Sequence, residues 1–278
     1  MKLRVVELLL VTTLPALFLA QKGVPTWSIT LWTLLGGTLA AGASNAFNMI
    51  IEVDSDRLMA RTSKRPIVTG AVTETQAFIF ASALTVISLT IFSVFTTLLA
   101  TVLTGAAIVF YVFGYTIGLK RRTSQNIVWG GVAGCMPVLI GWAAIANSLS
   151  LTAWLFFFVI FFWTPPHFWA LAIKYRDDYE AAGIPMLPVV ASIKSVQKQS
   201  WFHTIAMIIC SLGVNWSEHL PWWCWVITLA LALGFIQQLV RIDGPDSGKA
   251  AAKMFQWSIT YLSAYSLLLV IAVLVLNP

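Results

Sequence analysis

The amino-acid sequence predicts an all-α, polytopic membrane protein: a bundle of nine transmembrane helices with a cytoplasmic N-terminus and an external C-terminus. Three observations lead to this fold class. Of the 278 residues, 59% are hydrophobic and only 10% are charged, whereas soluble domains carry about 25% charged residues. Apolar runs long enough to cross a bilayer recur along the whole chain. Lysine and arginine are concentrated in alternate connections between these runs.

The boundaries of the spans follow from the thickness of the bilayer. A hydrocarbon core about 30 Å thick needs roughly 20 apolar residues in a helix, so the sequence divides wherever charged or turn residues interrupt such a run. A β-barrel is excluded because the apolar run at 153–163 does not alternate as a lipid-facing strand would. The expected spans are 5–20, 27–51, 76–95, 97–119, 127–147, 151–173, 201–214, 221–240 and 255–276.

The positive charges predict the orientation. Only Lys22 lies outside one set of connections. The other sixteen of the 17 Lys and Arg residues lie in the N-terminus and in 52–75, 119–126, 174–200 and 241–254. By the positive-inside rule, this set faces the cytoplasm.

The first span also fits a retained helix better than a signal peptide. It follows Lys2 and Arg4, as a signal peptide would, but it contains Pro15 and has no small-x-small cleavage site. No presequence rich in arginine and serine precedes it. We therefore expect a multi-pass protein of a prokaryotic plasma membrane.

The rest of the composition indicates one domain and excludes several classes. No linker rich in Pro, Gly or Ser divides the chain, so residues 1–278 are expected to form a single domain. Soluble enzymes, nucleic-acid-binding modules and secreted disulfide scaffolds do not fit this composition. The cysteines and two of the histidines show no ligand spacing and are interpreted as structural: Cys135, Cys210, Cys224, His203 and His219.

The second span ends in a polar stripe. Four polar residues are spaced three, four and four apart: Asn45, Asn48, Glu52 and Asp56. If the helix continues, this spacing places all four within an arc of roughly 80°, with Asp54 on the opposite side. Two amides and two carboxylates are costly in an apolar span unless something binds there. Oxygen ligands of this kind suit Mg²⁺.

Positive side chains follow the stripe directly. The segment R-T-S-K-R-P contains Arg61 and Arg65, and the planar fork of arginine suits phosphate oxygens. The connection between the fourth and fifth spans brings Lys120 and Arg121 to the same face. The sequence therefore predicts a cytoplasm-facing cavity for a metal-bound diphosphate, with a lipid tail running between the helices.

A second polar cluster follows the sixth span, in W-T-P-P-H-F-W-A-L-A-I-K-Y-R-D-D-Y. The Pro165-Pro166 pair is expected to kink or restart the helix, because each ring removes a donor and clashes with the preceding turn. From there His167, Lys174 and Asp178 share one stripe, with Asp177 about 80° round, and His167 lies about 16 Å deeper than Asp178. A histidine among aromatic residues suits a hydrogen-bonded core position as well as a ligand.

Three sequence blocks resemble the UbiA superfamily of intramembrane prenyltransferases, and within it the enzymes that farnesylate heme. They are N-A-F-N-M-I-I-E-V-D-S-D-R-L-M-A-R-T-S-K-R-P at 45–66, Y-T-I-G-L-K-R-R-T-S-Q-N-I at 115–127 and W-T-P-P-H-F-W-A-L-A-I-K-Y-R-D-D-Y-E-A-A-G-I-P-M-L-P at 163–188. The third block is the heme-specific one. Glu52 departs from the family pattern, which usually has Asp there, so the carboxylate is kept and its reach grows by one methylene.

The resemblance implies transfer of the farnesyl group of farnesyl diphosphate to a vinyl group of heme B, giving heme O and diphosphate. Mg²⁺ is the implied cofactor and heme B is a substrate. Implied catalytic residues are Asn45, Asn48, Glu52, Asp56 and Asp178, and implied metal ligands are Asn48, Glu52, Asp56, Asp177 and Asp178. Diphosphate or a heme propionate would meet Arg61, Arg65, Lys120, Arg121 and Lys174. Heme would meet Trp163, Phe168 and Trp169, with His167 at its iron.

Other functions remain open from the sequence. A UbiA-type enzyme acting on a quinone precursor would need no histidine ligand. An organic-anion transporter would place its charges near the membrane midplane, between broken helices. A structural subunit of a respiratory complex would leave the acidic motifs unexplained. The expected partners are farnesyl diphosphate, heme B, membrane lipids and a downstream heme-modifying enzyme, with no nucleic acid.

Overall fold

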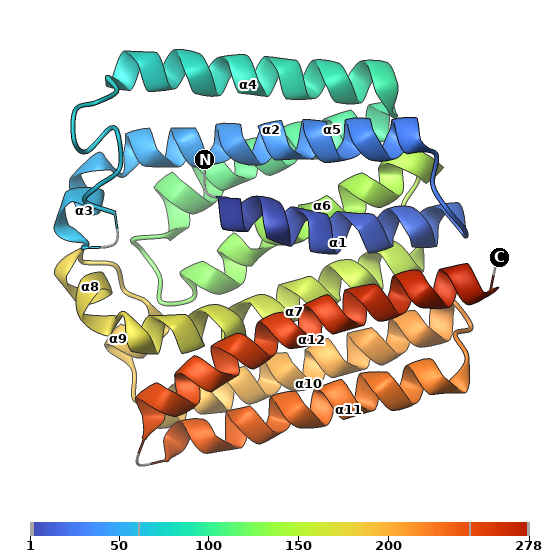
Figure 1. Ribbon diagram of the computed structural model, residues 1–278. Helices are drawn as coiled ribbons and strands as arrows, with labels where there is room; N and C mark the ends of the chain where they lie inside the picture. Colours follow the sequence, from blue (N-terminus) through green and yellow to red (C-terminus); the bar gives the residue numbers. More distant parts are fainter. Residues whose placement is uncertain (1–2, 61, 245, 277–278) are drawn as a thin grey trace.

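The protein is a bundle of long helices that run roughly side by side (Figure 1). The computed structural model describes residues 3–60, 62–244 and 246–276, with side chains described from residue 11 onward. These residues form helices and connections and contain no strand. The predicted all-α class is therefore confirmed.

Long helices occupy the regions of the predicted spans. They are α1 (Leu3–Gln21), α2 (Trp27–Ile51), α4 (Glu74–Phe95), α5 (Leu98–Val109), α6 (Asn126–Ala146), α7 (Leu151–Lys174), α10 (Ile193–Ser217), α11 (Trp222–Val240) and α12 (Ser247–Leu276). Helices α10 and α12 each begin eight residues earlier than expected. A π-helix, η1 (Phe110–Leu119), extends α5. Short elements complete the chain: α3 (Val53–Leu58), α8 (Arg176–Ala181), α9 (Leu187–Val190) and the 3₁₀ turn η2 (Arg241–Asp243).

Seven of the described helices are long and apolar enough to cross a membrane, so the chain is a multi-pass membrane protein. These spans are Trp27–Ile51, Glu74–Phe95, Leu98–Leu119, Asn126–Ala146, Leu151–Lys174, Trp222–Asp243 and Ser247–Leu276. The apolar part of α1 that is described in full, Val11–Gln21, is shorter. Helix α10 is long, but its first three turns carry two lysines, two glutamines and two serines, which lower its hydropathy.

Side-chain caps set the start of several of these helices. Thr73 and Gln76 form a reciprocal capping box before α4. Thr97, Ser150 and Ser192 each accept a hydrogen bond from a backbone N–H in the first turn of α5, α7 and α10. These residues satisfy donors that the helix itself leaves free.

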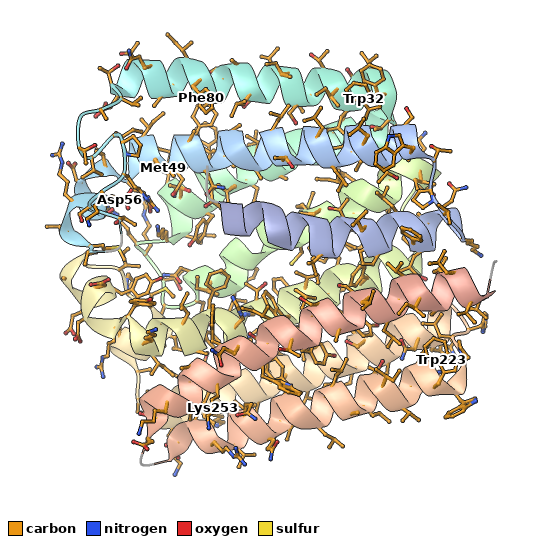
Figure 2. The ribbon with its side chains drawn as sticks, in the orientation of Figure 1. Trp32, Met49, Asp56, Phe80, Trp223 and Lys253 are labelled. Carbon is orange, nitrogen blue, oxygen red and sulfur yellow. The ribbon has the colours of Figure 1, made fainter. Side chains whose placement is uncertain are left out.

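The two ends of the bundle differ. Helices α3, α8 and α9 and the connections η1–α6 and α11–α12 lie at one end, and short turns occupy the other (Figure 1). Asp56 and Lys253 lie toward the first end, and Trp32 and Trp223 toward the second (Figure 2). The charged segments of the sequence are therefore gathered at one end of the bundle.

The sequence suggested that helix α7 kinks or restarts at its proline pair, but the helix does not restart there. It runs without a break from Leu151 to Lys174 through Pro165-Pro166. The hydroxyl of Thr164 donates to the carbonyl of Ile160 at 2.8 Å, and most of the helix is buried against its neighbours. Packing and side-chain hydrogen bonds of this kind let a buried span tolerate prolines.

Close packing between α2 and α4 generates a first prediction. An added Cβ at Gly36 would lie 2.8 Å from a ring carbon of Phe92, which is fully buried and cannot swing away. We expect Gly36→Ala to destabilise the protein by about 1–3 kcal/mol and to lower its melting temperature in detergent. Gly134→Ala is the matched control, because a Cβ there meets nothing within 4 Å. Equal melting temperatures for the two variants would contradict this account of the contact.

Candidate functional site

The polar stripe at the end of α2 is buried. Asn45, Asn48, Glu52 and Asp56 are at most 6% exposed, whereas the side chain of Asp54 is 86% exposed. The helix is irregular at Glu52, but the backbone N–H groups of Glu52 and Asp56 still donate four residues back. The turns therefore stay in register, and the four side chains share a face as the spacing predicts.

Glu52 is the centre of a hydrogen-bonded ion pair. Its Oε2 atom accepts from Lys120 Nζ at 2.5 Å and from Asn48 Nδ2 at 2.9 Å. The side chain of Glu52 is only 4% exposed and that of Lys120 is 18% exposed. The carboxylate is thus shielded from water, and one cation and one amide compensate for its lost hydration.

The π-helix η1 brings Lys120 to this carboxylate. The wide turns of η1 let the Thr116 hydroxyl donate to the carbonyl of Tyr111 at 2.9 Å, and Lys120 N donates to the carbonyl of Tyr115. Thr116 Oγ1 accepts from Asn48 Nδ2 at 3.3 Å. Sequence reasoning missed Thr116, because apolar residues dominate 110–119 and no pattern there distinguishes a π-helix from an α-helix. Such π turns recur at functional sites.

A second ion pair lies beside the first. The Arg65 guanidinium donates to Asp56 Oδ2, and Arg121 donates to the Ser55 hydroxyl at 2.8 Å. The Thr62 hydroxyl donates to the backbone carbonyl of Asp56. This hydrogen bond holds the loop after α3 against that helix. Asp56, Arg65 and Arg121 are therefore gathered as predicted, while Arg61 lies outside the described residues.

An apolar cavity begins one helical turn from Asn48. Helix α2 contributes Thr33, Gly37, Ala40, Ala41 and Ser44 to its wall, and α1, α5 and α6 supply the rest. Small side chains dominate the α2 side, so the space lies between the helices. The cavity has an apolar lining of the kind that a lipid tail requires, and its volume of about 80 Å³ is enough for only part of such a tail.

The second acidic cluster lies at the same end of the bundle but apart from the first. Helix α7 ends at Lys174 and α8 begins at Arg176, so the predicted stripe is interrupted at Tyr175. Lys174 and Asp177 are exposed and Asp178 is half-buried. Within the described part of the chain, no three His, Cys, Asp or Glu side chains come together to hold one metal ion.

Apolar packing nevertheless connects the two clusters. Met59, which follows α3, belongs to the same buried cluster as Tyr179 and Ile184 of the α8 region. Helices α3 and α8 accordingly lie near each other at one end of the bundle (Figure 1).

His167 occupies a buried aromatic slot. It is 8% exposed and stacks between Trp163 and Phe255, with ring centroids 4.2 Å and 4.5 Å away. Phe168 meets its edge at 5.0 Å. The second stacking partner, Phe255, comes from α12 and was not selected from the sequence, because nothing in the chain links positions so far apart.

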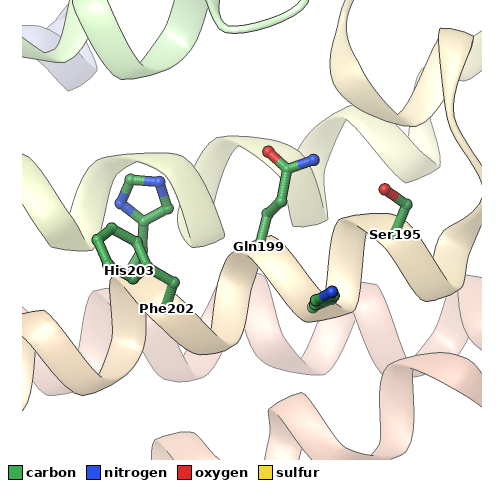
Figure 3. Close-up of a pocket in the computed structure, with 5 residues that line it drawn as sticks. Ser195, Gln199, Phe202 and His203 are labelled. Carbon is green, nitrogen blue, oxygen red and sulfur yellow. The ribbon is translucent and has the colours of Figure 1, made fainter.

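Trp169 does not lie beside His167, although the sequence led us to expect both residues at the same heme. Two residues along an α-helix turn the side chain by about 200°, so Trp169 points to the other side of α7 and meets the ring of His203 at 5.4 Å. His203 lines a hollow of about 390 Å³ on α10, together with Ser195, Gln199 and Phe202 (Figure 3).

The fold and the site together define a multi-pass membrane protein with buried carboxylates and cations at one end of the bundle, next to an apolar cavity. The chain matches the sequence model of the UbiA prenyltransferase family over residues 9–259 and belongs to this family. The resemblance seen in the sequence is thereby confirmed.

Curated relatives are similar over nearly the whole chain. A protein named protoheme IX farnesyltransferase from Frankia casuarinae is 45% identical over 280 residues, covering 99% of this chain and 96% of its own. Another of the same name, from Streptomyces avermitilis, is 45% identical over 269 residues, covering 94% of this chain and 88% of its own.

Solved structures share the fold. An apo UbiA homolog from Aeropyrum pernix K1 superposes with a TM-score of 0.75 at 20% identity, covering 94% of this chain and 96% of that one. A UbiA homolog from Archaeoglobus fulgidus, bound to DMAPP and Mg²⁺, gives 0.71 at 18% identity, covering 94% and 97%. At such identities the likeness concerns the fold alone.

The ion pair of Glu52 generates a prediction about stability. Lys120→Met leaves a buried carboxylate with only an amide donor, so we expect it to destabilise the protein by up to about 3 kcal/mol. Arg122→Met removes an exposed cation from the same loop and should leave stability unchanged. Thermal unfolding in detergent measures both variants. If Lys120→Met unfolds at the same temperature as Arg122→Met, the buried pair does not stabilise this end of the bundle.

Proposed function

We propose that this protein transfers the farnesyl group of farnesyl diphosphate to a vinyl group of heme B, forming heme O and diphosphate. One observation supports this above the others: the two buried ion pairs, Glu52–Lys120 and Asp56–Arg65, lie next to an apolar cavity. A substrate with a diphosphate head and an isoprenoid tail matches both parts. The curated relatives named protoheme IX farnesyltransferase supply the identity of the two substrates.

The donors of the site fit Mg²⁺. Glu52, Asp56 and Asn48 offer hard oxygen atoms, and Mg²⁺ usually binds through one or two carboxylates together with substrate phosphates. A site of this kind does not need a third acidic ligand. We propose Glu52 and Asp56 as the ligands, with Asn48 beside them and Asp177 and Asp178 as ligands that α8 would contribute. Bound Mg²⁺ would neutralise the charge that develops on the leaving diphosphate.

The cations of the site have a complementary role. Lys120 and Arg65 compensate the two carboxylates, and the same side chains are within reach of a diphosphate bound over them. Arg121, held by Ser55, adds a third cation. Fixed positive charge stabilises a leaving group most when it is already in place and partly shielded from water. Arg61 and Lys174 are proposed as further contacts to diphosphate or a heme propionate.

The reaction itself needs no protein nucleophile. Breaking the C1–O bond of farnesyl diphosphate releases diphosphate and leaves an allylic cation. The vinyl group of heme attacks this cation and forms the new carbon–carbon bond, and water then adds to the resulting cation and loses a proton. The apolar walls around Ala40 and Ala41 would keep other water away from the first cation.

Heme is proposed to bind along α7. His167 has the aromatic surroundings that a porphyrin ring requires, with Trp163 and Phe255 on its two faces. A neutral imidazole can bind heme iron. Phe168, on the same stretch of α7, is proposed to pack the macrocycle, whereas Trp169 points to the other side of the helix. A quinone precursor would make no use of an imidazole ligand.

We also propose nine membrane spans in a single domain. Helices α1 and α10 would join the seven apolar spans, with the charged end of the bundle in the cytoplasm of a prokaryotic cell. Trp27, Trp216 and Trp222 are 62–79% exposed and lie where the spans end on the opposite side. Tryptophan is enriched at membrane interfaces, and the surrounding lipid is the expected partner there.

A product assay tests the proposed function. The purified protein is incubated with heme B, farnesyl diphosphate and Mg²⁺, and heme O is measured by mass spectrometry. We expect heme O to form and its formation to stop when Mg²⁺ is chelated. Prenylation of a quinone precursor with no heme O would favour the other branch of the family.

The buried carboxylates should matter more than their exposed neighbour. Glu52→Gln and Asp56→Asn each remove a ligand charge, so we expect transfer to fall by at least about 100-fold, the scale on which single electrostatic groups act. Asp54→Asn is the matched control, because Asp54 points into solvent. The measurement is the initial rate of heme O formation. A larger loss for Asp54→Asn than for Glu52→Gln would overturn this assignment.

Cysteine labelling tests the orientation. We expect Lys22→Cys, in the connection between α1 and α2, to react with a membrane-impermeant maleimide on intact cells. Lys249→Cys, at the start of α12, should react only after the cells are permeabilised. The reverse pattern would place the charged end outside.

A further inference from the structure

Ser258 of α12 lies at the centre of a small hydrogen-bond network beneath the His167 slot. Its hydroxyl is fully buried and lies 2.7 Å from His167 Nδ1. The same hydroxyl donates to the backbone carbonyl of Phe255 at 2.6 Å. The backbone carbonyl of Ser258 accepts from Trp163 Nε1 at 2.7 Å.

This network determines which nitrogen of His167 carries the proton. A serine hydroxyl has one hydrogen, and a carbonyl oxygen can only accept. The Ser258 hydrogen therefore goes to Phe255, and the close contact with His167 requires that Nδ1–H donates to Ser258 Oγ. The imidazole is then the neutral Nδ1–H tautomer, and its Nε2 carries a free electron pair.

The contacts around His167 cover the rest of the ring more than this nitrogen. Trp163 and Phe255 stack on the two faces of the ring, and Ser258 holds the Nδ1 corner. His167 stays 8% exposed, and its hydrogen bond to Ser258 uses Nδ1, which leaves Nε2 as the ring nitrogen available to a ligand. An electron-pair acceptor would therefore approach the ring at Nε2.

We propose that Ser258 is a positioning residue that holds His167 in the Nδ1–H tautomer and presents Nε2 to the iron of substrate heme. This inference rests on the proposed function for its ligand, but not on the transfer step. Histidines that bind metals commonly donate their other N–H to a fixed acceptor, which sets the ring orientation and raises the basicity of the ligand. Trp163 serves the same end, because its hydrogen bond to Ser258 ties α7 to α12 beside the ring.

The test is a titration of purified variants with ferric heme B, followed by the Soret band, in the absence of farnesyl diphosphate. Loss of such an outer-shell partner costs 10–100-fold in metal affinity, so we expect Ser258→Ala to weaken heme binding by at least about 10-fold and to alter the band. Ser258→Thr, which keeps the hydroxyl, should bind like the wild type. Ser266→Ala is the matched control: Ser266 is also buried on α12, and its hydroxyl has no partner among the described residues.

A double variant separates positioning from packing. If Ser258 acts through His167, Ser258→Ala should add nothing to His167→Ala, since residues in one network are not additive. Further weakening in the double variant would overturn the proposal, as would wild-type affinity and an unchanged Soret band for Ser258→Ala. If Ser258→Ala does not fold, Ser258→Cys gives the same comparison with a weak acceptor.

Failure of the role proposed for Ser258 can be distinguished from failure of the proposed function. Heme O formation by the wild type together with unaltered heme binding in Ser258→Ala would remove only the role of Ser258. A wild type that forms no heme O, but whose heme spectrum depends on Ser258 and His167, would remove the transfer reaction and keep the ligand. A wild type that does not bind heme would remove both.

Discussion

The burial of two carboxylates at the end of a membrane helix is the constraint on which the rest of this structure depends. Glu52 and Asp56 are each about 3% exposed, and an isolated charge in such a place costs several kcal/mol. Lys120 and Arg65 offset that cost from two different connections. Each pair therefore fixes a loop: the first holds the end of η1, and the second folds the segment after α3 back over the end of α2. The acidic stripe is thus a structural centre as well as the proposed site for a cation and a diphosphate.

The same constraint explains why the site lies at one end of the bundle. A transporter with charges near the midplane would need broken helices there, whereas the buried ion pairs here lie where α2 ends and α3 begins. Deeper between the helices, the small side chains of α2 leave an apolar cavity. In the proposed function, consecutive turns of one helix would therefore meet the charged head and the start of the apolar tail, without burying any further charge.

Much of this arrangement could be predicted from the sequence because it depends on local periodicity. The helical spacing of the polar stripe predicted the common face of Asn45, Asn48, Glu52 and Asp56. The alternation of charged connections predicted which loops lie at the same end of the bundle. Contacts between distant segments could not be predicted in this way. Nothing in 110–119 indicates a π-helix that carries Thr116 to Asn48, and nothing in α12 indicates that Phe255 and Ser258 reach His167. The interruption at Tyr175 was also missed, because the stripe through Asp178 assumed an unbroken helix.

The most direct test of the central claim is the binding of inorganic diphosphate, measured by calorimetry on the purified protein with and without Mg²⁺. If the buried carboxylates hold a cation that the diphosphate shares, the wild type should bind diphosphate at least tenfold more tightly with Mg²⁺ than without it, and Glu52→Gln should lose that difference. Equal binding with and without Mg²⁺, or a Mg²⁺ effect that persists in Glu52→Gln, would contradict the account, because the cations alone would then hold the diphosphate.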